Sequence, residues 1–294
     1  MEFFLQMLVT GIVVGSIYGL VALGFVLIYR SSDVLNLANG EFVVIGAYVC
    51  LSIMTASNMA FIPALGVTLI ISVLLGFIVE RLVVRPLQNA PVISIIMATI
   101  GLSSLMAGLV HMVWGHNTRT FPQVFSNVPV EFAGVIIMPV YIWSFIIVMV
   151  LLIAFSVFFK FSKMGVAMRA VADDKKAAMS MGISVKVVLA VTWAIAAVVA
   201  SIGGTMLGML NGVSPGMATI GLTVLPVVIL GGLDSIGGAI IGGFLIGIIQ
   251  NLVGGYMDPM VGGGLKEVVP FIIVLLILLI KPYGLFGKGG AERV

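Results

Sequence analysis

Apolar stretches of about twenty residues recur along the chain and are separated by short polar segments. A helix needs about 20 mainly apolar residues to cross a membrane, whereas membrane strands alternate apolar and polar positions. The pattern therefore predicts an all-α polytopic membrane protein with about eight to nine embedded helices. The nine predicted segments are Phe3–Ile28, Val34–Met54, Phe61–Val79, Val92–Trp114, Pro139–Phe159, Val187–Leu210, Met217–Leu233, Ile236–Met257 and Val268–Ile280.

Two of the later segments carry residues that interrupt helices. Met217–Leu233 is short and contains Gly221 and Pro226, and Ile236–Met257 is rich in glycine. Backbone that leaves the helical state at membrane depth must face protein or water. We therefore expect broken or re-entrant helices in this region.

Composition supports the same class. Apolar residues make up 61% of the chain and charged residues 9%, against roughly 45–50% and about 25% in soluble proteins. So few charges exclude a soluble enzyme, a nucleic-acid binder and a disordered protein. We expect one membrane domain, residues 1–294, in contact with lipid, with an outer loop at 115–138 and a charged inner loop at 160–186.

Lysine and arginine concentrate in alternate loops. If all nine segments cross and the N-terminus lies outside, only Arg119 and Lys266 of the 14 basic residues lie outside. Cytoplasmic loops carry an excess of basic residues, so the N-terminus is expected outside and the C-terminus in the cytoplasm. The remaining basic residues are Arg30, Arg81, Arg85, Lys160, Lys163, Arg169, Lys175, Lys176, Lys186, Lys281, Lys288 and Arg293.

Glycines recur at four-residue spacing in two segments. The first segment holds Gly11, Gly15 and Gly19, and the eighth holds Gly238 and Gly242. Small residues at this spacing let two helix backbones approach closely in lipid. Tight packing inside one subunit is one interpretation, and a subunit interface or pore lining is the alternative.

Polar residues stand directly before and within the second apolar segment. Asp33 is a candidate N-cap, and Gly40 is expected to break the first turn. Asn36, Asn39 and Glu41 are costly in hydrocarbon and must face protein, water or backbone. One interpretation is a capped, partly broken helix start. The alternative is that these side chains line a translocation path or contact a cytoplasmic partner.

The inner loop is the longest charged stretch of the chain. Arg169, Asp173, Lys176 and Ser180 recur at spacings of four, three and four, which predicts one polar helical stripe. Such an element is suited to rest on anionic lipid. The acidic pair and the small residues of this loop instead favour docking into a protein groove.

A short helix is expected inside this loop. Asp173 or Asp174 is a suitable N-cap for a helix through Met181, and Gly182 is suited to end it. The loop is therefore predicted to form a helix, a turn and a short helix across the cytoplasmic face.

Several motifs together resemble the branched-chain amino-acid ABC permeases, and specifically their LivH-type subunit. The inner loop is similar to the coupling region of that family, so the resemblance assigns ATPase coupling to Gly165, Arg169, Asp173, Asp174, Ala177, Ala178 and Gly182. The other matching stretches are residues 19–24 (GLVALG), 27–29 (LIY), 35–41 (LNLANGE), 46–48 (GAY), 228–239 (VILGGLDSIGGA), 241–243 (IGG) and 281–287 (KPYGLFG).

The resemblance implies a subunit of an ATP-driven importer in the bacterial inner membrane. Its implied partners are a second, LivM-type permease subunit, two cytoplasmic ATPase subunits and an external substrate-binding protein. The chain has no Gly-x-x-x-x-Gly-Lys-Ser/Thr motif, so the ATPase partners are expected to use the ATP, and this chain is expected to bind no cofactor. ATP-driven closure of the partners would move the inner loop and produce alternating access.

The implied cargo is a branched-chain or related hydrophobic amino acid. Asn39 and Asp234 depart from residues common in the family, which leaves urea, amides and aromatic acids as alternative cargo. Few side chains are suited to bind an amino acid tightly within the membrane, so a weakly binding passage is expected. Asn211 and Ser214 are candidates for an outer gate, with a capped outer turn as the alternative.

Three other classes of function compete with the importer. An ion-coupled transporter commonly buries ionisable residues at mid-depth, whereas Glu41, Glu80, Asp234 and Glu267 are expected near segment ends. We interpret His111 as a satisfied interfacial histidine. A channel is supported only by the glycine motifs. A membrane enzyme has no support, because the sequence shows no metal-ligand cluster, no nucleophile with a base and no paired carboxylates; no catalytic or metal-binding residue is predicted.

Overall fold

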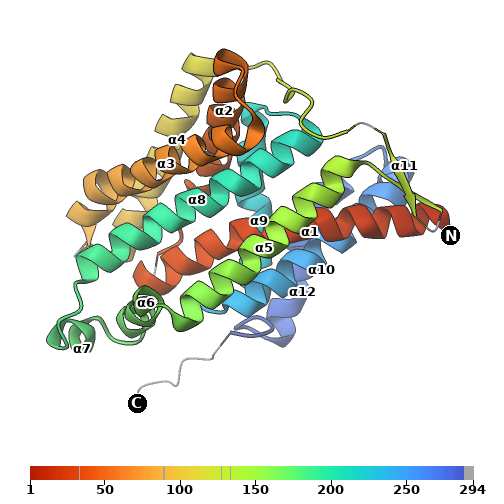
Figure 1. The fold of residues 1–294 in the computed structure, drawn as a ribbon. Coiled ribbons are helices and arrows are strands. Elements are labelled where there is room, and N and C mark those ends of the chain that lie inside the picture. Colours follow the sequence, from red (N-terminus) through yellow and green to blue (C-terminus); the bar gives the residue numbers. More distant parts are fainter. Residues whose placement is uncertain (33, 89, 127, 133, 288–294) are drawn as a thin grey trace.

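The computed structural model describes residues 1–287 except 33, 89, 127 and 133. It is an all-α polytopic fold, as the sequence predicts (Figure 1). Seven of its helices are long and apolar enough to cross a membrane, and Pro215–Gly231 is a shorter apolar helix. The α-helices are α1 (Glu2–Ser32), α2 (Asn39–Ser57), α3 (Phe61–Val79), α4 (Val92–Trp114), α5 (Pro139–Phe161), α6 (Lys163–Asp173), α7 (Lys175–Ser180), α8 (Val185–Asn211), α9 (Thr219–Gly231), α10 (Ile236–Tyr256), α11 (Asp258–Val261) and α12 (Leu265–Ile280).

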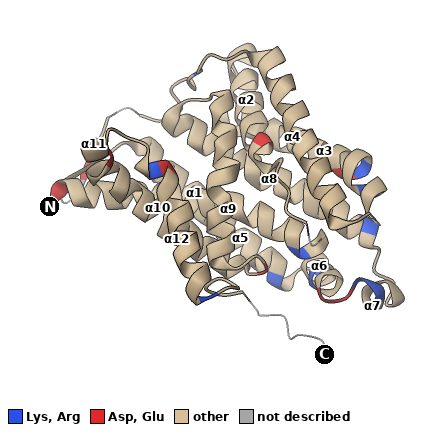
Figure 2. Cartoon of the chain, turned by 180° about the vertical axis from the view of Figure 1, so that it is seen from behind, with Lys and Arg blue, Asp and Glu red and all other residues tan. Residues whose placement is uncertain are grey.

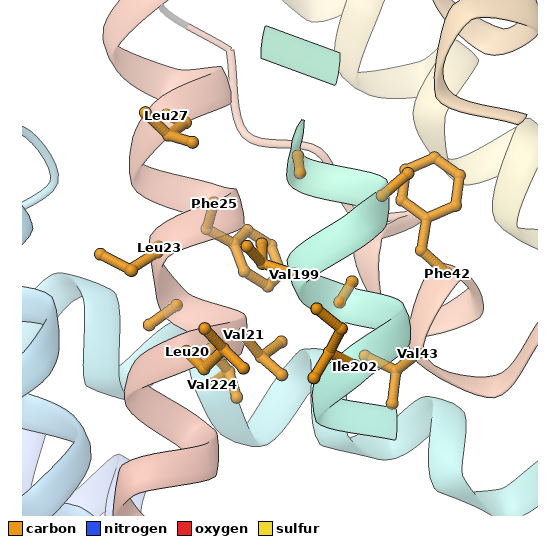
Figure 3. Packing of buried hydrophobic residues seen from close by; sticks show 14 of the residues in the cluster. Leu20, Val21, Leu23, Phe25, Leu27, Phe42, Val43, Val199, Ile202 and Val224 are labelled. Atoms are coloured by element: carbon orange, nitrogen blue, oxygen red, sulfur yellow. The ribbon is translucent and has the colours of Figure 1, made fainter. Parts of the chain in front are cut away.

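Helix α1 lies at the centre of the bundle, between α8 and α10. Figure 3 shows Val21 and Phe25 of α1 facing Val199 of α8, with Phe42 of α2 on the far side of α8. The hydrophobic side chains from Ile17 to Ile28 are buried, so the middle of α1 is shielded from lipid by its neighbours.

The α1 glycines bring α1 close to α10. A Cβ atom added to Gly15 would lie 2.7 Å from the carbonyl oxygen of Gly243 and 2.9 Å from the Cα of Phe244, and Gly11 is equally close to α10. Gly19 lies near Ile240. These glycines are therefore used for packing inside the subunit.

Gly238 and Gly242 pack against a different helix, α9. A Cβ atom on Gly242 would lie 2.6 Å from the carbonyl oxygen of Val227, and Gly238 touches the backbone of Gly231. Helix α10 is also continuous from Ile236 to Tyr256, so the expected break in this glycine-rich segment is wrong. Close packing on both sides offsets the low helix propensity of glycine.

The seventh segment is broken, as expected. A 3₁₀ turn, η3 (Pro215–Ala218), precedes α9, which has only 13 residues. A second interruption was not predicted: α3 continues into a π-helical turn, η1 (Glu80–Val84), and a 3₁₀ turn, η2 (Arg85–Leu87). The fully buried Glu80 pairs there with Arg85 at 2.9 Å.

The predicted outer loop contains a small hairpin that the sequence analysis missed. Strands β1 (Val130–Phe132) and β2 (Val135–Ile137) pair antiparallel near the start of α1. Earlier in the loop, Arg119 forms a two-way backbone bridge with Val213 after α8. This bridge fixes the loop to the turn between α8 and η3.

Basic residues gather at one end of the bundle. Figure 2 shows basic residues around α6, α7 and the end of α3, far from the start of α1. We call the end of the bundle that holds α7 the α7 end, and the end that holds the start of α1 the opposite end. Arg119 follows α4 along the chain and Lys266 follows α10, so both lie at the opposite end. Lys288 and Arg293 lie outside the described residues.

Candidate translocation path and coupling region

The chain between α1 and α2 runs into the bundle without forming a helix. Helix α2 begins at Asn39 and not at Val34 as predicted. The Leu37 N–H instead donates to Thr99 Oγ1 on α4 at 3.4 Å, and the Ala38 N–H donates to Asn36 Oδ1 at 3.1 Å. Ala38 occupies the N-cap position with no side-chain cap. The predicted cap, Asp33, lies outside the described residues.

The starts of α2 and α9 meet inside the bundle. Gly40 touches the carbonyl oxygen of Ala218, and a Cβ atom on Gly221 would lie 2.7 Å from the Gly40 backbone. The expectation that Gly40 breaks the first turn is therefore wrong. It is part of α2, and its missing side chain permits this contact. Helix starts that meet at membrane depth are typical of transporter binding regions.

Polar groups without partners cluster at the start of α2. Asn39 is 0% exposed, yet neither polar atom of its side chain has a hydrogen-bond partner, and Nδ2 of the buried Asn36 also has none. Glu41 is 6% exposed and accepts a hydrogen bond from Ser103 of α4 at 3.3 Å. An unsatisfied buried polar group costs about 1–3 kcal/mol. Such a cluster is a functional candidate.

Two buried aromatic side chains, one near the start of α2 and one further along it, also have polar atoms without partners. The indole Nε1 of the buried Trp193 has no partner, and its ring lies 6.5 Å from that of Phe42 near the start of α2. Along α2, the buried Tyr48 hydroxyl also has no partner, and its ring stacks on Trp114 at 5.1 Å. We call Asn36, Asn39, Glu41, Tyr48, Ser103 and Trp193 the polar seam.

The histidine prediction needs correction. Nδ1 of His111 is buried and has no hydrogen-bond partner, so the residue is not satisfied as expected. Its ring stacks on His116 at 4.2 Å. Within the part of the chain that the structure describes, no three His, Cys, Asp or Glu residues come close enough to hold a metal.

The two outer-gate candidates flank the turn between α8 and η3. Asn211 ends α8 and is exposed, and Ser214 precedes η3 with no side-chain cap. Between them, Gly212 has a φ of 82° and Val213 pairs with Arg119. The turn is thus fixed by backbone pairing, whereas Asn39 and Glu41 lie inside the bundle.

Two predicted coupling residues hold the corner between α5 and α6. The Gly165 N–H donates to Ser162 Oγ at 2.9 Å, and Gly165 lies so close to the Phe159 carbonyl that a side chain has no room. The Arg169 guanidinium donates to the carbonyls of Phe159 and Lys160 at the end of α5. It also lies 5.5 Å from the Phe159 ring centroid. Arg169 therefore links α6 directly to the end of α5.

Helix α7 is capped at both ends. Asp174 Oδ1 accepts hydrogen bonds from the N–H groups of Lys176 and Ala177 at 2.8 and 3.0 Å. At the other end Gly182 has a φ of 83°, and the Ile183 N–H donates to the Ala178 carbonyl at 3.0 Å. This is a Schellman motif. Two caps define a short helix that is marginal by length alone.

The predicted polar stripe does not form on one helix. Arg169 and Asp173 belong to α6, whereas Lys176 and Ser180 belong to α7. The extended Asp174, with φ −155° and ψ 111°, separates the two helices because its side chain caps the second.

Helix α7 presents one face to the surface and the other to the bundle. Ala178 is buried, whereas Lys176, Ala177 and Met181 are exposed. Small exposed side chains beside two charged residues suit contact with another protein better than immersion in lipid. Figure 1 shows α6 and α7 together at one end of the bundle.

An apolar helical bundle with a polar seam at membrane depth is typical of membrane transport proteins. A family model described as "Branched-chain amino acid transport system / permease component" matches residues 7–279. The chain therefore belongs to the permease family of branched-chain amino-acid ABC transporters, and it is a multi-pass membrane protein.

Curated relatives match over nearly their full lengths. The high-affinity branched-chain amino acid transport system permease protein LivH of Escherichia coli is 32% identical over 99% of this chain and 98% of the relative. The permease protein BraD of Pseudomonas aeruginosa is 29% identical with the same coverage. A probable LivH of Methanocaldococcus jannaschii is 28% identical over 94% of this chain and 90% of the relative.

Proposed function

We propose that this chain is one permease subunit of an ATP-driven importer for branched-chain or related hydrophobic amino acids. It acts as a single transmembrane unit in the bacterial cytoplasmic membrane, with its N-terminus outside and its C-terminus inside. The family and its relatives support the class. The observation that carries the mechanism is the polar seam, whose unpartnered groups provide a path at membrane depth.

Substrate moves along this seam by alternating access. The starts of α2 and α9 touch through Gly40 and Gly221 with no side chain between them. Two helices that meet through glycines slide with few clashes, so either can tilt to open the seam toward one side. Asn39 has no hydrogen-bond partner in the structure, and in the open state water or substrate satisfies it.

Separate ATPase subunits drive the change. Two cytoplasmic ATPases press on the exposed face of α7, and this chain itself binds neither ATP nor another cofactor. Arg169 links α6 to the end of α5, so a displaced α6–α7 unit moves a membrane helix. An external substrate-binding protein delivers the cargo to the opposite end of the bundle.

A second permease subunit covers the side of the bundle formed by α4 and η3. The exposed faces of α3, α4, α5 and α12 all carry large apolar side chains. On α4, Gly101, Ser104 and Gly108 are exposed and follow one face, and Thr219 is exposed beside η3. Small residues on a membrane helix favour close contact with another helix. These positions also lie near Ser103 and Glu41, so the second subunit completes the path.

Glu41 favours an amino acid over urea or amides as cargo. A buried carboxylate offers an ammonium group a partner in a low-dielectric setting. Urea, amides and aromatic acids have no ammonium group, and the seam offers them only neutral donors and acceptors.

The same carboxylate supports one rival. Glu41 lies in the first turn of α2, near a segment end as expected, but it is buried inside the bundle, and a buried carboxylate is what an ion-coupled secondary transporter uses. The two functions make different demands on energy, because only the importer needs ATPase subunits.

Reconstitution distinguishes the ATP-driven importer from the ion-coupled secondary transporter. The complete transporter, with both permeases, the ATPases and the binding protein, is placed in proteoliposomes and supplied with radiolabelled leucine. We expect uptake only with ATP, and none from the purified chain under a proton or sodium gradient. Gradient-driven uptake by this chain alone would establish the secondary transporter and contradict our proposal.

A further inference from the structure

Helices α2 and α4 are joined by polar side-chain contacts near both ends of α2. Ser103 Oγ donates to Glu41 Oε1 at 3.3 Å near the start of α2, and Trp114 Nε1 donates to Ser52 Oγ at 2.7 Å near its end. In both pairs the α4 residue lies 62 positions further along the chain, so the two helices run parallel and side by side. Glu41 and Ser52 are about 16 Å apart along α2. The two contacts therefore limit the part of the polar seam that lies between these helices.

The backbone of α2 packs closely on α8. Gly46 of α2 touches the backbone of Ser201 on α8, and Gly204 of α8 touches the carbonyl of Val43. Backbone packing of this kind holds two helices together through van der Waals contact. The hydrogen bonds from α2 to Ser103 and Trp114 of α4 are instead made by side chains, which can exchange partners. The contact between α2 and α4 can therefore open while α2 remains on α8.

Two aromatic rings lie across the seam toward the opposite end. The rings of Tyr48 and Trp114 stack with their centroids 5.1 Å apart. Trp114 is half-buried, whereas Tyr48 is 0% exposed and its hydroxyl has no hydrogen-bond partner. A buried hydroxyl without a partner is unfavourable. Separation of the two rings would let water or cargo satisfy it.

Two hydrogen bonds hold Trp114, one through its ring and one through its backbone. The ring is bonded to Ser52, and the carbonyl accepts a hydrogen bond from Nη2 of the exposed Arg119 at 2.9 Å. The backbone of Arg119 pairs in turn with Val213 after α8. The end of α4 is thus fixed independently of the ring, so the ring can leave Ser52 while the backbone keeps its place.

We infer that Tyr48 and Trp114 form the external gate of the path and that the Ser52 hydroxyl holds this gate closed. When the Trp114 ring leaves Ser52 and Tyr48, water reaches the seam from the opposite end. The assignment rests on the proposed function, which places the opposite end outside.

Access to the seam from each end of the bundle tests the gate. Ser103→Cys is the reporter, in a chain whose buried Cys50 is replaced by alanine. The complete transporter is kept without ATP in membrane vesicles of each orientation, and a membrane-impermeant methanethiosulfonate is added outside the vesicles. Trp114→Phe keeps a ring but removes the N–H donor, and Ser52→Ala removes its acceptor. Each should raise the reaction rate from the opposite end about fivefold, as loss of one net hydrogen bond does, and leave the rate from the α7 end unchanged.

Two substitutions serve as matched controls. Trp143→Phe changes an exposed tryptophan of α5, and Thr55→Ala removes an exposed hydroxyl near the end of α2 that donates to the Leu51 carbonyl. Neither should change the reaction rate of the reporter from either end. An equal rise from both ends, an equal effect of Trp143→Phe and Trp114→Phe, or an unchanged rate in both Trp114→Phe and Ser52→Ala would each overturn the gate.

Leucine uptake separates failure of the gate from failure of the proposed function. In the complete transporter with ATP, Trp114→Ala lacks the closing ring, so uptake should fall at least about tenfold, whereas Trp143→Ala should keep wild-type uptake. Uptake by Trp114→Ala within twofold of the wild type would overturn the gate and leave the proposed function in place. A wild-type transporter that shows no ATP-driven uptake would refute the proposed function instead, while the reporter would still decide whether Trp114 closes the seam.

Discussion

The contact between α1 and α10 differs sharply from the contact between α2 and its neighbours α4 and α9. In the first, Gly11 and Gly15 bring two backbones together and the surrounding side chains are apolar. In the second, two helix starts meet through Gly40 and Gly221, beside buried polar atoms without partners. Glycine thus brings apolar helices together in one region and polar helix starts together in the other.

The difference predicts which contacts keep the bundle folded and which change during transport. Close packing in lipid depends on van der Waals contact over a long interface, which α1 and α10 have. Unsatisfied polar groups favour states in which they are hydrated or bound. We therefore expect the contact between α1 and α10 to remain unchanged while α2 moves relative to α4 and to the start of α9. The following substitutions test this division, from the largest expected effect to the smallest.

Gly15→Leu should abolish folding. The new side chain would meet the α10 backbone less than 3 Å from its Cβ atom, and overpacking of this kind costs about 3 kcal/mol or more. We expect almost no monodisperse protein by size-exclusion chromatography after membrane extraction. Gly66→Leu on α3 is the control, because nothing lies within 4 Å of a Cβ atom there. Normal yield of Gly15→Leu would show that the α1–α10 contact is not essential.

Glu41→Gln should strongly reduce transport without preventing folding. The amide has nearly the same shape as the carboxylate but lacks its charge. Because charged hydrogen bonds contribute about 1.5–3 kcal/mol, leucine uptake should fall at least about tenfold. ATP-driven uptake and ATP hydrolysis are measured together, with the exposed Glu267→Gln as control. Uptake within twofold of the wild type would remove Glu41 from the path.

Gly101→Trp and Gly108→Trp should weaken assembly with the second permease subunit. Both glycines are exposed on α4 with open space around them, so the chain itself accommodates tryptophan. Gly66→Trp places the same side chain in equally open space on α3. We expect co-purification of the second permease to fall about fivefold for the α4 variants. This fall corresponds to a loss of about 1 kcal/mol of binding free energy, because the two helices can no longer approach closely. An equal result for all three would place the interface elsewhere.

Asp174→Ala should have the smallest effect. It removes the N-cap of α7, which costs about 1 kcal/mol. Since α7 lies at the surface and α6 keeps its own contacts, the bundle should remain folded, with an unchanged midpoint of thermal unfolding. ATP hydrolysis per leucine transported should rise several-fold. Asp173→Ala, which changes the last residue of α6 and not the cap, is the comparison.

Apolar length predicted the embedded helices because each one needs about twenty residues to cross lipid. The start of α2 could not be predicted this way. Val34 to Ala38 is mostly apolar, but Thr99, far along the chain, accepts its backbone hydrogen bond. The continuity of α10 likewise depends on α1 and α9 and not on its own glycine-rich sequence.

The polar residues of the candidate path were only partly predictable. Asn36, Asn39 and Glu41 were identified because polar groups are costly in an apolar segment. Tyr48 and Trp193 were missed, since an aromatic residue in a membrane helix carries no sign that its polar atom is unpartnered. In the coupling region, Asp174 and Gly182 have strong local preferences for helix ends, so the short helix could be predicted, whereas the corner held by Arg169 depends on tertiary contact.

The central claim is that the polar seam becomes a water-filled path during transport. The most direct measurement is the reaction of single cysteines with a water-soluble methanethiosulfonate in the complete transporter, after the buried Cys50 is replaced by alanine. Ser103→Cys lies on the seam, and Ile153→Cys lies on the exposed apolar face of α5. We predict that Ser103→Cys reacts, that ATP changes its rate, and that Ile153→Cys does not react. Equal lack of reaction at both positions, with and without ATP, would contradict the account.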